Sequence, residues 1–185
     1  MLQFPMHIQV ITNPDRKITQ TVLYFQFRFM GWTSNDMIEQ DDRYGTLPFG
    51  YVIAYEGDKI VGVLNLLKRK ILFQGKPILV GGFGGVCTHS DYRKQGVATK
   101  MLKAGSETLK EQKCDIAFLC TDIKNIGKVY ANVGFKPLNR KYRATGLSGK
   151  IYESYDGMVA PVNSPDIFEQ VLNDTATFDL QGQDW

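Results

Sequence analysis

Residues 51–89 contain three apolar runs separated by two short turns, and this pattern limits the fold more than any other feature of the chain. The first turn is Gly57-Asp58 and the second is Gln74-Gly75. Glycine tolerates the backbone angles that tight hairpin connections need. The runs beside the turns are rich in valine, isoleucine and leucine, with repeated alternation typical of strands. The sequence therefore predicts three consecutive antiparallel strands in the middle of the chain.

The apolar period changes after residue 89. Residues 97–113 place apolar side chains on one broad stripe, which predicts an amphipathic helix. A short apolar run at 115–122 is typical of a buried strand, and a short helix is expected at 126–134, closed by Gly134. The other expected elements are strands at 7–12, 135–147 and 150–160, and helices at 18–30, 35–45 and 164–174. No repeat or linker divides them, so we expect one domain over residues 1–185.

Composition excludes several classes of protein. The 22 Lys and Arg residues against 19 Asp and Glu residues give a formal charge of +3, too mild an excess to indicate nucleic-acid binding. Three cysteines and two histidines show no spacing typical of disulfide frameworks or metal sites, which indicates a reducing compartment and no metal. No apolar run approaches the ~18 residues of a membrane span, and the first residues lack a secretory signal. We expect a cytoplasmic protein without a membrane or nucleic-acid partner.

The stretch RKQGVA, residues 93–98, lies where a strand gives way to the helix at 97–113. The first turn of a helix has backbone N–H groups without intrahelical partners and carries partial positive charge. Gly96 and Ala98 would let a diphosphate approach that backbone, and Arg93 and Lys94 add charge at the rim. The alternative is an ordinary turn with a solvated basic corner. The P-loop pattern GxxxxGK[ST] is absent.

The stretch also resembles a family signature. GCN5-related N-acetyltransferases bind the acyl-CoA pyrophosphate with the pattern Arg/Gln-x-x-Gly-x-Gly/Ala, which is complete at 93–98. The segments GGVCTHSDYRKQGVATKML (84–102) and NIGKVYANVGFKPL (125–138) resemble the family's central strand, loop and helix and its later Asn, Tyr and Gly-Phe positions. The resemblance covers about residues 50–140. It implies an α/β (α+β) fold with a central mixed, mostly antiparallel twisted sheet flanked by helices.

Within the superfamily the chain is most similar to aminoglycoside 2'-N-acetyltransferases and, more loosely, to rhizobial nodulation acyltransferases. The phrase KRKILFQGKPILVGGFGGVCTHSDYR (68–93) and the tail GQDW (182–185) carry this likeness. Outside the central segment the likeness is thin. It bears on the choice of acceptor only weakly.

The resemblance implies a set of acetyl-CoA contacts. Backbone groups of the strand before the loop would meet the pantetheine arm and thioester, and the loop and first helical turn would hold the pyrophosphate. These positions are Val86, Cys87 and Thr88, followed by Arg93, Lys94, Gln95, Gly96, Val97, Ala98 and Thr99. Asn125 would bind pantetheine amides or cap a helix. The glycines at 81, 82, 84 and 85 fit a ligand-binding strand or a bulge against a large neighbour.

Tyr130 matches the family's usual proton donor to the departing CoA thiolate. A phenol with a pKa of ~10 is protonated at neutral pH and can release its proton in a concerted step. The alternative is a buried aromatic side chain that packs the short helix. Cys120 suggests a covalent acyl-cysteine, but no histidine lies near it in sequence, so a buried structural cysteine is favoured.

The acceptor side is less clear from the sequence. Gly84 occupies the position at which related aminoglycoside enzymes carry a carboxylate, so a general base must lie elsewhere. The candidates are Asp36, Glu39 and Asp122, acting directly or through water, against the reading that each is a solvated charge. In the tail, Asp184, the terminal carboxylate and the Trp185 indole would bind a cationic amine by charge and cation–π contact. A frayed terminus is the favoured alternative.

These observations predict an acetyl-CoA-dependent N-acetyltransferase that transfers the acetyl group directly to a primary amine of a small polar or cationic acceptor, such as an aminoglycoside. Two alternatives remain open at this point. One is a peptide or protein N-acetyltransferase, which an acceptor groove open at both ends would favour. The other is a non-catalytic acyl-CoA-binding sensor, which the missing carboxylate at Gly84 allows. A homodimer is compatible with all three.

Overall fold

A computed structural model describes residues 5–31 and 41–185 of the 185-residue chain. The first half contains β1 (Met6–Thr12), α1 (Arg16–Met30), β2 (Gly50–Glu56), β3 (Lys59–Phe73), β4 (Lys76–Thr88), the short 3-10 helix η1 (Ser90–Tyr92) and α3 (Val97–Glu111). The second half contains β5 (Ile116–Cys120), α4 (Ile123–Ala131), β6 (Lys136–Pro137), β7 (Tyr142–Thr145), β8 (Ile151–Ser154), β9 (Gly157–Pro161), α5 (Pro165–Asn173) and β10 (Phe178–Asp179).

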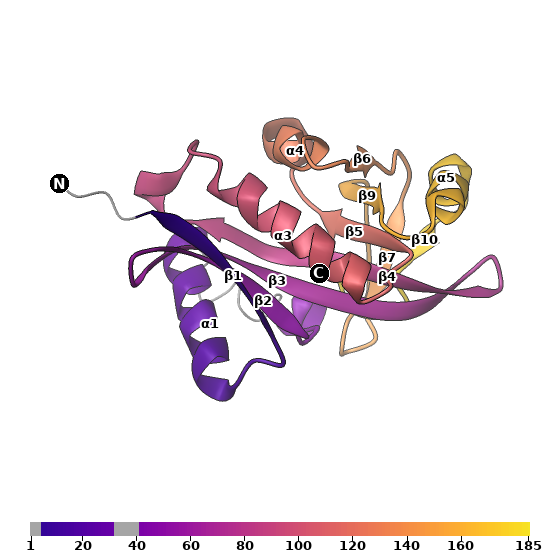
Figure 1. The fold of residues 1–185 in the computed structure, drawn as a ribbon. Coiled ribbons are helices and arrows are strands. Elements are labelled where there is room, and N and C mark those ends of the chain that lie inside the picture. Colours follow the sequence, from indigo (N-terminus) through magenta and orange to yellow (C-terminus); the bar gives the residue numbers. More distant parts are fainter. Residues whose placement is uncertain (1–4, 32–40) are drawn as a thin grey trace.

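The predicted meander is confirmed, because β2, β3 and β4 pair in antiparallel order through the two expected turns. They belong to a seven-stranded sheet with the order β1-β2-β3-β4-β5-β9-β6. In this sheet only β4 and β5 run parallel, since every other pair is antiparallel. The expected α/β architecture, a mixed and mostly antiparallel sheet flanked by helices, is confirmed (Figure 1).

The helices cover the two faces of this sheet. Tyr51 and Ile53 of β2 pack against Val22 and Phe25 of α1. The alternate residues of β2 belong instead to the core that α3 supplies with Met101, Leu102 and Leu109. Because successive side chains of a strand point to opposite faces, α1 and α3 lie on opposite sides of the sheet, as Figure 1 shows.

The two strands predicted at 135–147 and 150–160 are wrong in extent, because each divides into two. β6 and β9 join the large sheet, whereas β7 and β8 form a second sheet with β10 in the order β10-β7-β8. Asn139 adopts a left-handed backbone with φ of 57° between β6 and β7, which turns the chain out of the first sheet. The large and small sheets share a core that contains Phe118, Tyr142 and Phe178.

Helix ends follow their caps. α1 begins two residues earlier than predicted, because the Asp15 carboxylate accepts the Ile18 N–H at 2.8 Å. The helix predicted at 126–134 spans Ile123–Ala131 instead, because Asp122 caps it. For the helix predicted at 35–45, residues 41–44 are helical and residues 35–40 lie outside the described part of the chain.

Candidate active site

The β4–β5 ladder is short, and this defines the site. The two strands pair only from Val80–Ile116 to Gly82–Phe118. β4 continues to Thr88 alongside β3, and β5 continues to Cys120 alongside β9. No described ladder joins residues 83–88 of β4 to β5, and we call this stretch the open edge of β4. Backbone N–H and C=O groups along it are available to an extended ligand in the manner of an added strand.

A β-bulge shapes the open edge. The register with β3 shifts so that Val63 faces Cys87 and Asn65 faces Gly84, which leaves Gly85 and Val86 opposite one residue. Gly85 has φ of 54°, and a Cβ there would lie 2.2 Å from Gln26 Nε2. The bulge therefore requires glycine and turns the peptides at 85–86 away from the regular ladder.

The side chain of Gln26, which lies in α1, forms hydrogen bonds at this bulge. Its Nε2 donates to the Gly85 carbonyl at 2.8 Å and to Asn65 Oδ1 at 2.9 Å, and the residue is 1% exposed. A buried amide needs such partners, because an unsatisfied one costs about 1–3 kcal/mol. The sequence analysis missed Gln26. A glutamine among the apolar residues of the helix expected at 18–30 indicates a buried polar side chain that needs partners.

The signature loop lies at the N-terminus of α3 and is exposed from Arg93 to Gly96. Gly96 is the N-cap residue with φ of 78°, no side chain caps the helix, and no acidic residue occupies the first turn. A Cβ added to Gly96 would meet nothing within 4 Å. The first N–H groups of α3, at Val97, Ala98 and Thr99, follow an exposed glycine and have no side-chain cap, in the arrangement that binds phosphate.

Loop side chains fix the shape of this N-terminus. Arg93 donates through Nε to the Thr88 carbonyl and through Nη2 to the Phe29 carbonyl, both at 3.3 Å. Gln95 Nε2 donates to the Asp91 carbonyl at 2.7 Å. Arg93 consequently joins the end of β4 to the end of α1, besides contributing positive charge. The structure brings all predicted pyrophosphate positions together next to the open edge of β4.

Tyr130 lies in α4, directly beyond the end of β5. The residue is 7% exposed and packs its ring edge-on to Phe135. Burial raises the pKa of its phenol, while a side-chain hydrogen bond with Thr121 acts in the opposite direction. A phenol in this environment stays protonated at neutral pH, as a proton donor requires.

Asp156 lies at the same end of β5 and was missed by the sequence analysis, which placed it inside a strand. Its carbonyl accepts the Thr121 N–H at 3.0 Å, so Asp156 and Tyr130 both flank Thr121. Its Oδ1 is buried without a hydrogen-bond partner among the described residues. A buried carboxylate oxygen without a partner is rare and calls for an explanation.

Tyr130 and Cys120 pack on opposite faces of the large sheet. Tyr130 packs in the same core as Ala117 and Leu119 of β5. The Asp156 carboxylate interacts electrostatically with Cys120, whose side chain lies in the other core with Phe118. Asp156 thus lies at the end of β5, near Cys120 and next to Thr121, the residue that also bonds Tyr130.

Asp122 and Asn125 form a helix cap. The Asp122 carboxylate accepts the Asn125 backbone N–H at 3.2 Å and the Asn125 amide at 2.6 Å. These bonds lower the pKa of Asp122, the side-chain bond most. A carboxylate with a lowered pKa is a weaker base, so Asp122 is better explained as the α4 cap than as a general base. The other candidates, Asp36 and Glu39, lie outside the described residues.

The tail is packed into the protein, so the favoured expectation of a frayed terminus is wrong. Asp184 is fully buried and accepts hydrogen bonds from Arg43, at 2.8 and 3.0 Å, and from the Tyr142 hydroxyl at 2.8 Å. Burial raises the pKa of Asp184, against the effect of these donors. Its accepting capacity is used within the protein, so we do not assign it to an acceptor amine.

Trp185 explains two of the glycines in β4. Its ring would lie 1.9 Å from a Cβ at Gly82, and the carbon of its main-chain carboxyl group 3.2 Å from a Cβ at Gly84. The space beside Gly84 is therefore filled by Leu67 and by the main-chain carboxyl group of Trp185. Trp185 is 6% exposed, and its indole Nε1 has no hydrogen-bond partner among the described residues.

The three thiols are protected by burial, and we expect them to be inert. Burial raises the pKa of Cys87 and Cys114 to about 11 and also raises that of Cys120, whose Sγ donates to the Trp185 carbonyl. Native protein should react slowly with a disulfide reagent at pH 8, and unfolded protein should release three equivalents at once. Because the folded pKa values exceed the unfolded ones, the free energy of unfolding should fall from pH ~9 to ~11. Rapid native labelling of Cys120 at pH 8 would revive the acyl-cysteine alternative.

The described residues, 5–31 and 41–185, lack two kinds of feature. They contain no group of three or more His, Cys, Asp or Glu side chains arranged to hold a metal ion. Within the same ranges, no helix has the length and apolar character needed to cross a membrane.

Comparison with known proteins agrees with this geometry. The family profile described as an acetyltransferase (GNAT) domain matches residues 19–138, more than half of the chain. No curated protein sequence matches the chain.

Solved structures share the fold at low identity. Escherichia coli ElaA has a TM-score of 0.61 at 16% identity, over 84% of this chain and 99% of that one. The ribosomal-protein-S18-alanine N-acetyltransferase from E. coli has a TM-score of 0.55 at 12% identity, over 84% and 94%. A GCN5-related N-acetyltransferase from Anabaena variabilis has a TM-score of 0.59 at 16% identity, over 74% of this chain and 34% of that one. The chain thus spans about a third of the length of the first structures it matches.

Proposed function

Because the chain belongs to the GNAT acetyltransferase family, we propose that it transfers an acetyl group from acetyl-CoA directly to a primary amine of a small polar or cationic acceptor. The observation that carries this proposal is the uncapped N-terminus of α3, with Gly96 open to solvent, beside the open edge of β4. The N-terminus of α3 suits a pyrophosphate, and the open edge of β4 suits the extended amide chain of pantetheine.

The donor-side chemistry follows from these groups. The amine nitrogen attacks the thioester carbon, the C–S bond breaks, and CoA leaves as a thiolate that must be protonated. Backbone N–H groups at the bulge near Val86 would stabilise the charge that develops on the carbonyl oxygen, an effect worth about 3–4 kcal/mol for one such donor. Tyr130 would supply the proton to the sulfur.

The acceptor would enter from the face that carries Asp156. The Asp156 Oδ1, which has no partner among the described residues, suits an ammonium or amine N–H, and Asp156 flanks Thr121 together with Tyr130. The amine proton released after attack would pass to Asp156 or to water. This arrangement supports a cationic acceptor, because a carboxylate favours it electrostatically.

We expect Asp156→Asn to raise the Michaelis constant for the amine about 10- to 100-fold, while that for acetyl-CoA stays within twofold. The change removes one charged hydrogen bond, worth about 1.5–3 kcal/mol, and keeps the side-chain volume. The measurement is steady-state kinetics with each substrate varied in turn. Asp166→Asn, at an exposed position in the first turn of α5, is the control and should change neither constant. Unchanged amine kinetics in Asp156→Asn would remove Asp156 from the acceptor site.

Thiol release from acetyl-CoA across a panel of amines tests the function itself. The panel contains an aminoglycoside, spermidine, a peptide with a free N-terminus and a peptide with an internal lysine. Turnover with the first two supports the proposal, and turnover with peptides alone replaces the acceptor class. Tight CoA binding without turnover on any amine would instead support the acyl-CoA sensor.

A further inference from the structure

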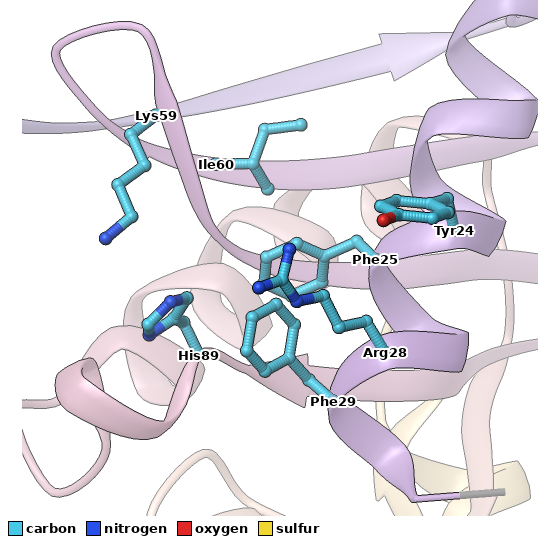
Figure 2. Close-up of a pocket in the computed structure, with 7 residues that line it drawn as sticks. All are labelled: Tyr24, Phe25, Arg28, Phe29, Lys59, Ile60 and His89. Atoms are coloured by element: carbon cyan, nitrogen blue, oxygen red, sulfur yellow. The ribbon is translucent and has the colours of Figure 1, made fainter.

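A separate cavity lies between α1 and the β2–β3 turn, on the face of the sheet opposite to α3. It has a volume of about 380 Å³ and is lined by four residues of α1, two at the start of β3 and His89, which follows β4. Figure 2 shows side chains from these three segments directed toward a common space. The volume falls in the range of small-molecule sites.

The lining of this cavity is basic. Arg28 comes from α1 and Lys59 from the start of β3, and no carboxylate belongs to the lining among residues 5–31 and 41–185. Among the described residues neither side chain forms an ion pair: Arg28 lies 5.5 Å from the centre of the Phe29 ring, and Lys59 Nζ lies 5.0 Å from the centre of the Tyr92 ring. Two cations that face a common space without an anion attract one.

His89 adds a neutral donor to the same space. Its Nδ1 accepts the Asp91 N–H at 3.2 Å, so the proton of the neutral ring is on Nε2. The Asp91 carboxylate lies 3.9 Å from Nδ1, and the nearby Glu56 accepts the Tyr92 hydroxyl hydrogen. Neither Asp91 nor Glu56 forms an ion pair with Arg28 or Lys59.

The cavity also has an aromatic wall. The Phe29 ring lies 4.7 Å from the Phe25 ring and 4.5 Å from the His89 ring, measured between centres. Tyr24 adds a ring at the rim, where it is 65% exposed. Flat aromatic surfaces beside cations suit a planar ring that bears a negative group.

We infer that this cavity binds a small aromatic anion, a planar ring with a carboxylate or phosphate group. The ring would stack on Phe29, and the anionic group would meet Arg28, Lys59 and the His89 Nε2–H. The cavity lies beside the proposed acyl-CoA site, because Cys87 packs with Phe25 on the α1 face whereas Val97 packs in the core on the α3 face. The Arg93 bond to the Phe29 carbonyl is a direct link between the two sites.

Calorimetric titration with four probes tests the inference without reference to acetyl transfer. The probes are 1-naphthoate, 1-naphthyl phosphate, the neutral 1-naphthamide and the non-aromatic cyclohexanecarboxylate. We expect one naphthoate or naphthyl phosphate per chain, bound at least tenfold more tightly than the amide and cyclohexanecarboxylate. The tighter of the two anions identifies the preferred acidic group.

A pair of matched variants locates the site. Arg28→Met combined with Lys59→Met should weaken the anion at least tenfold. Arg16→Met combined with Lys17→Met removes the same charge at exposed positions of α1 and should have little effect. Equal affinity for naphthoate and naphthamide in the unmodified protein, unchanged binding in the first variant, or equal losses in both variants would overturn the inference. So would displacement of naphthoate by saturating CoA, which would place it in the acyl-CoA site.

Discussion

Tyr130→Phe is expected to lower turnover by about 10²–10⁴-fold while acetyl-CoA affinity stays within about twofold. The change removes one hydroxyl from a ring that is otherwise buried, so the packing against Phe135 is kept. General acid catalysis is worth this range of rate in other enzymes. Without the phenol, the CoA thiolate must leave without a proton from this position or take one from water.

The pH dependence sharpens this prediction. Because burial raises the pKa of Tyr130, the phenol stays protonated through neutral pH and beyond its ordinary pKa of ~10. The unmodified enzyme should therefore show no loss of turnover from Tyr130 below pH ~10. Pre-steady-state kinetics, in which acetyl transfer is observed directly, is the measurement. Tyr155→Phe, at a residue that is 64% exposed, is the control. A Tyr130→Phe enzyme with normal single-turnover rates would reduce Tyr130 to a packing residue.

The parts of the fold that sequence predicts well depend on local interactions. The turns at Gly57-Asp58 and Gln74-Gly75 determine the β2–β3–β4 meander, since Gln74 and Gly75 adopt the left-handed backbone that the second turn needs. The signature loop is also a local feature. Its six consecutive residues are enough to predict a glycine at the N-terminus of a helix that has no side-chain cap. Its place beside the open edge of β4 follows from the strand that leads into it.

The parts that sequence misses depend on contacts between distant residues. β7 and β10 pair although Tyr142 and Phe178 are far apart in the chain, and no local pattern indicates that pairing. The ion pair between Arg43 and Asp184 likewise joins residues that are far apart in the chain, and it holds the tail in the core. The sequence analysis missed Asp156 for the same reason. Asp156 connects β8 of the small sheet to β9 of the large sheet, whereas the sequence predicted one strand over 150–160.

The glycines of β4 show why residue type alone is ambiguous. Gly82 and Gly84 make room for Trp185, whereas Gly85 makes the bulge that Gln26 holds. The run of glycines predicts that there is no space for side chains along this strand. The sequence does not show whether main chain, an indole ring or a ligand occupies that space. The reason why each position requires glycine depends on which distant residue packs against it.

Gly96→Val is expected to weaken CoA binding at least about 100-fold in a protein that still folds. The valine side chain would occupy the open space over the first N–H groups of α3, where we propose that the pyrophosphate lies. Loss of two charge-assisted hydrogen bonds, at about 1.5–3 kcal/mol each, is enough for this change. Calorimetric titration with CoA is the measurement.

Backbone strain must be separated from obstruction, because Gly96 has φ of 78° and valine disfavours that conformation. Gly75 provides the matched control: its φ is 76°, a Cβ there also meets nothing within 4 Å, and it lies in the β3–β4 turn. Both valine variants should lose a similar free energy of unfolding, but only Gly96→Val should lose CoA. If the two variants bound CoA equally well, the anion would not lie at the N-terminus of α3, and the six-residue signature would be only a turn with two cations.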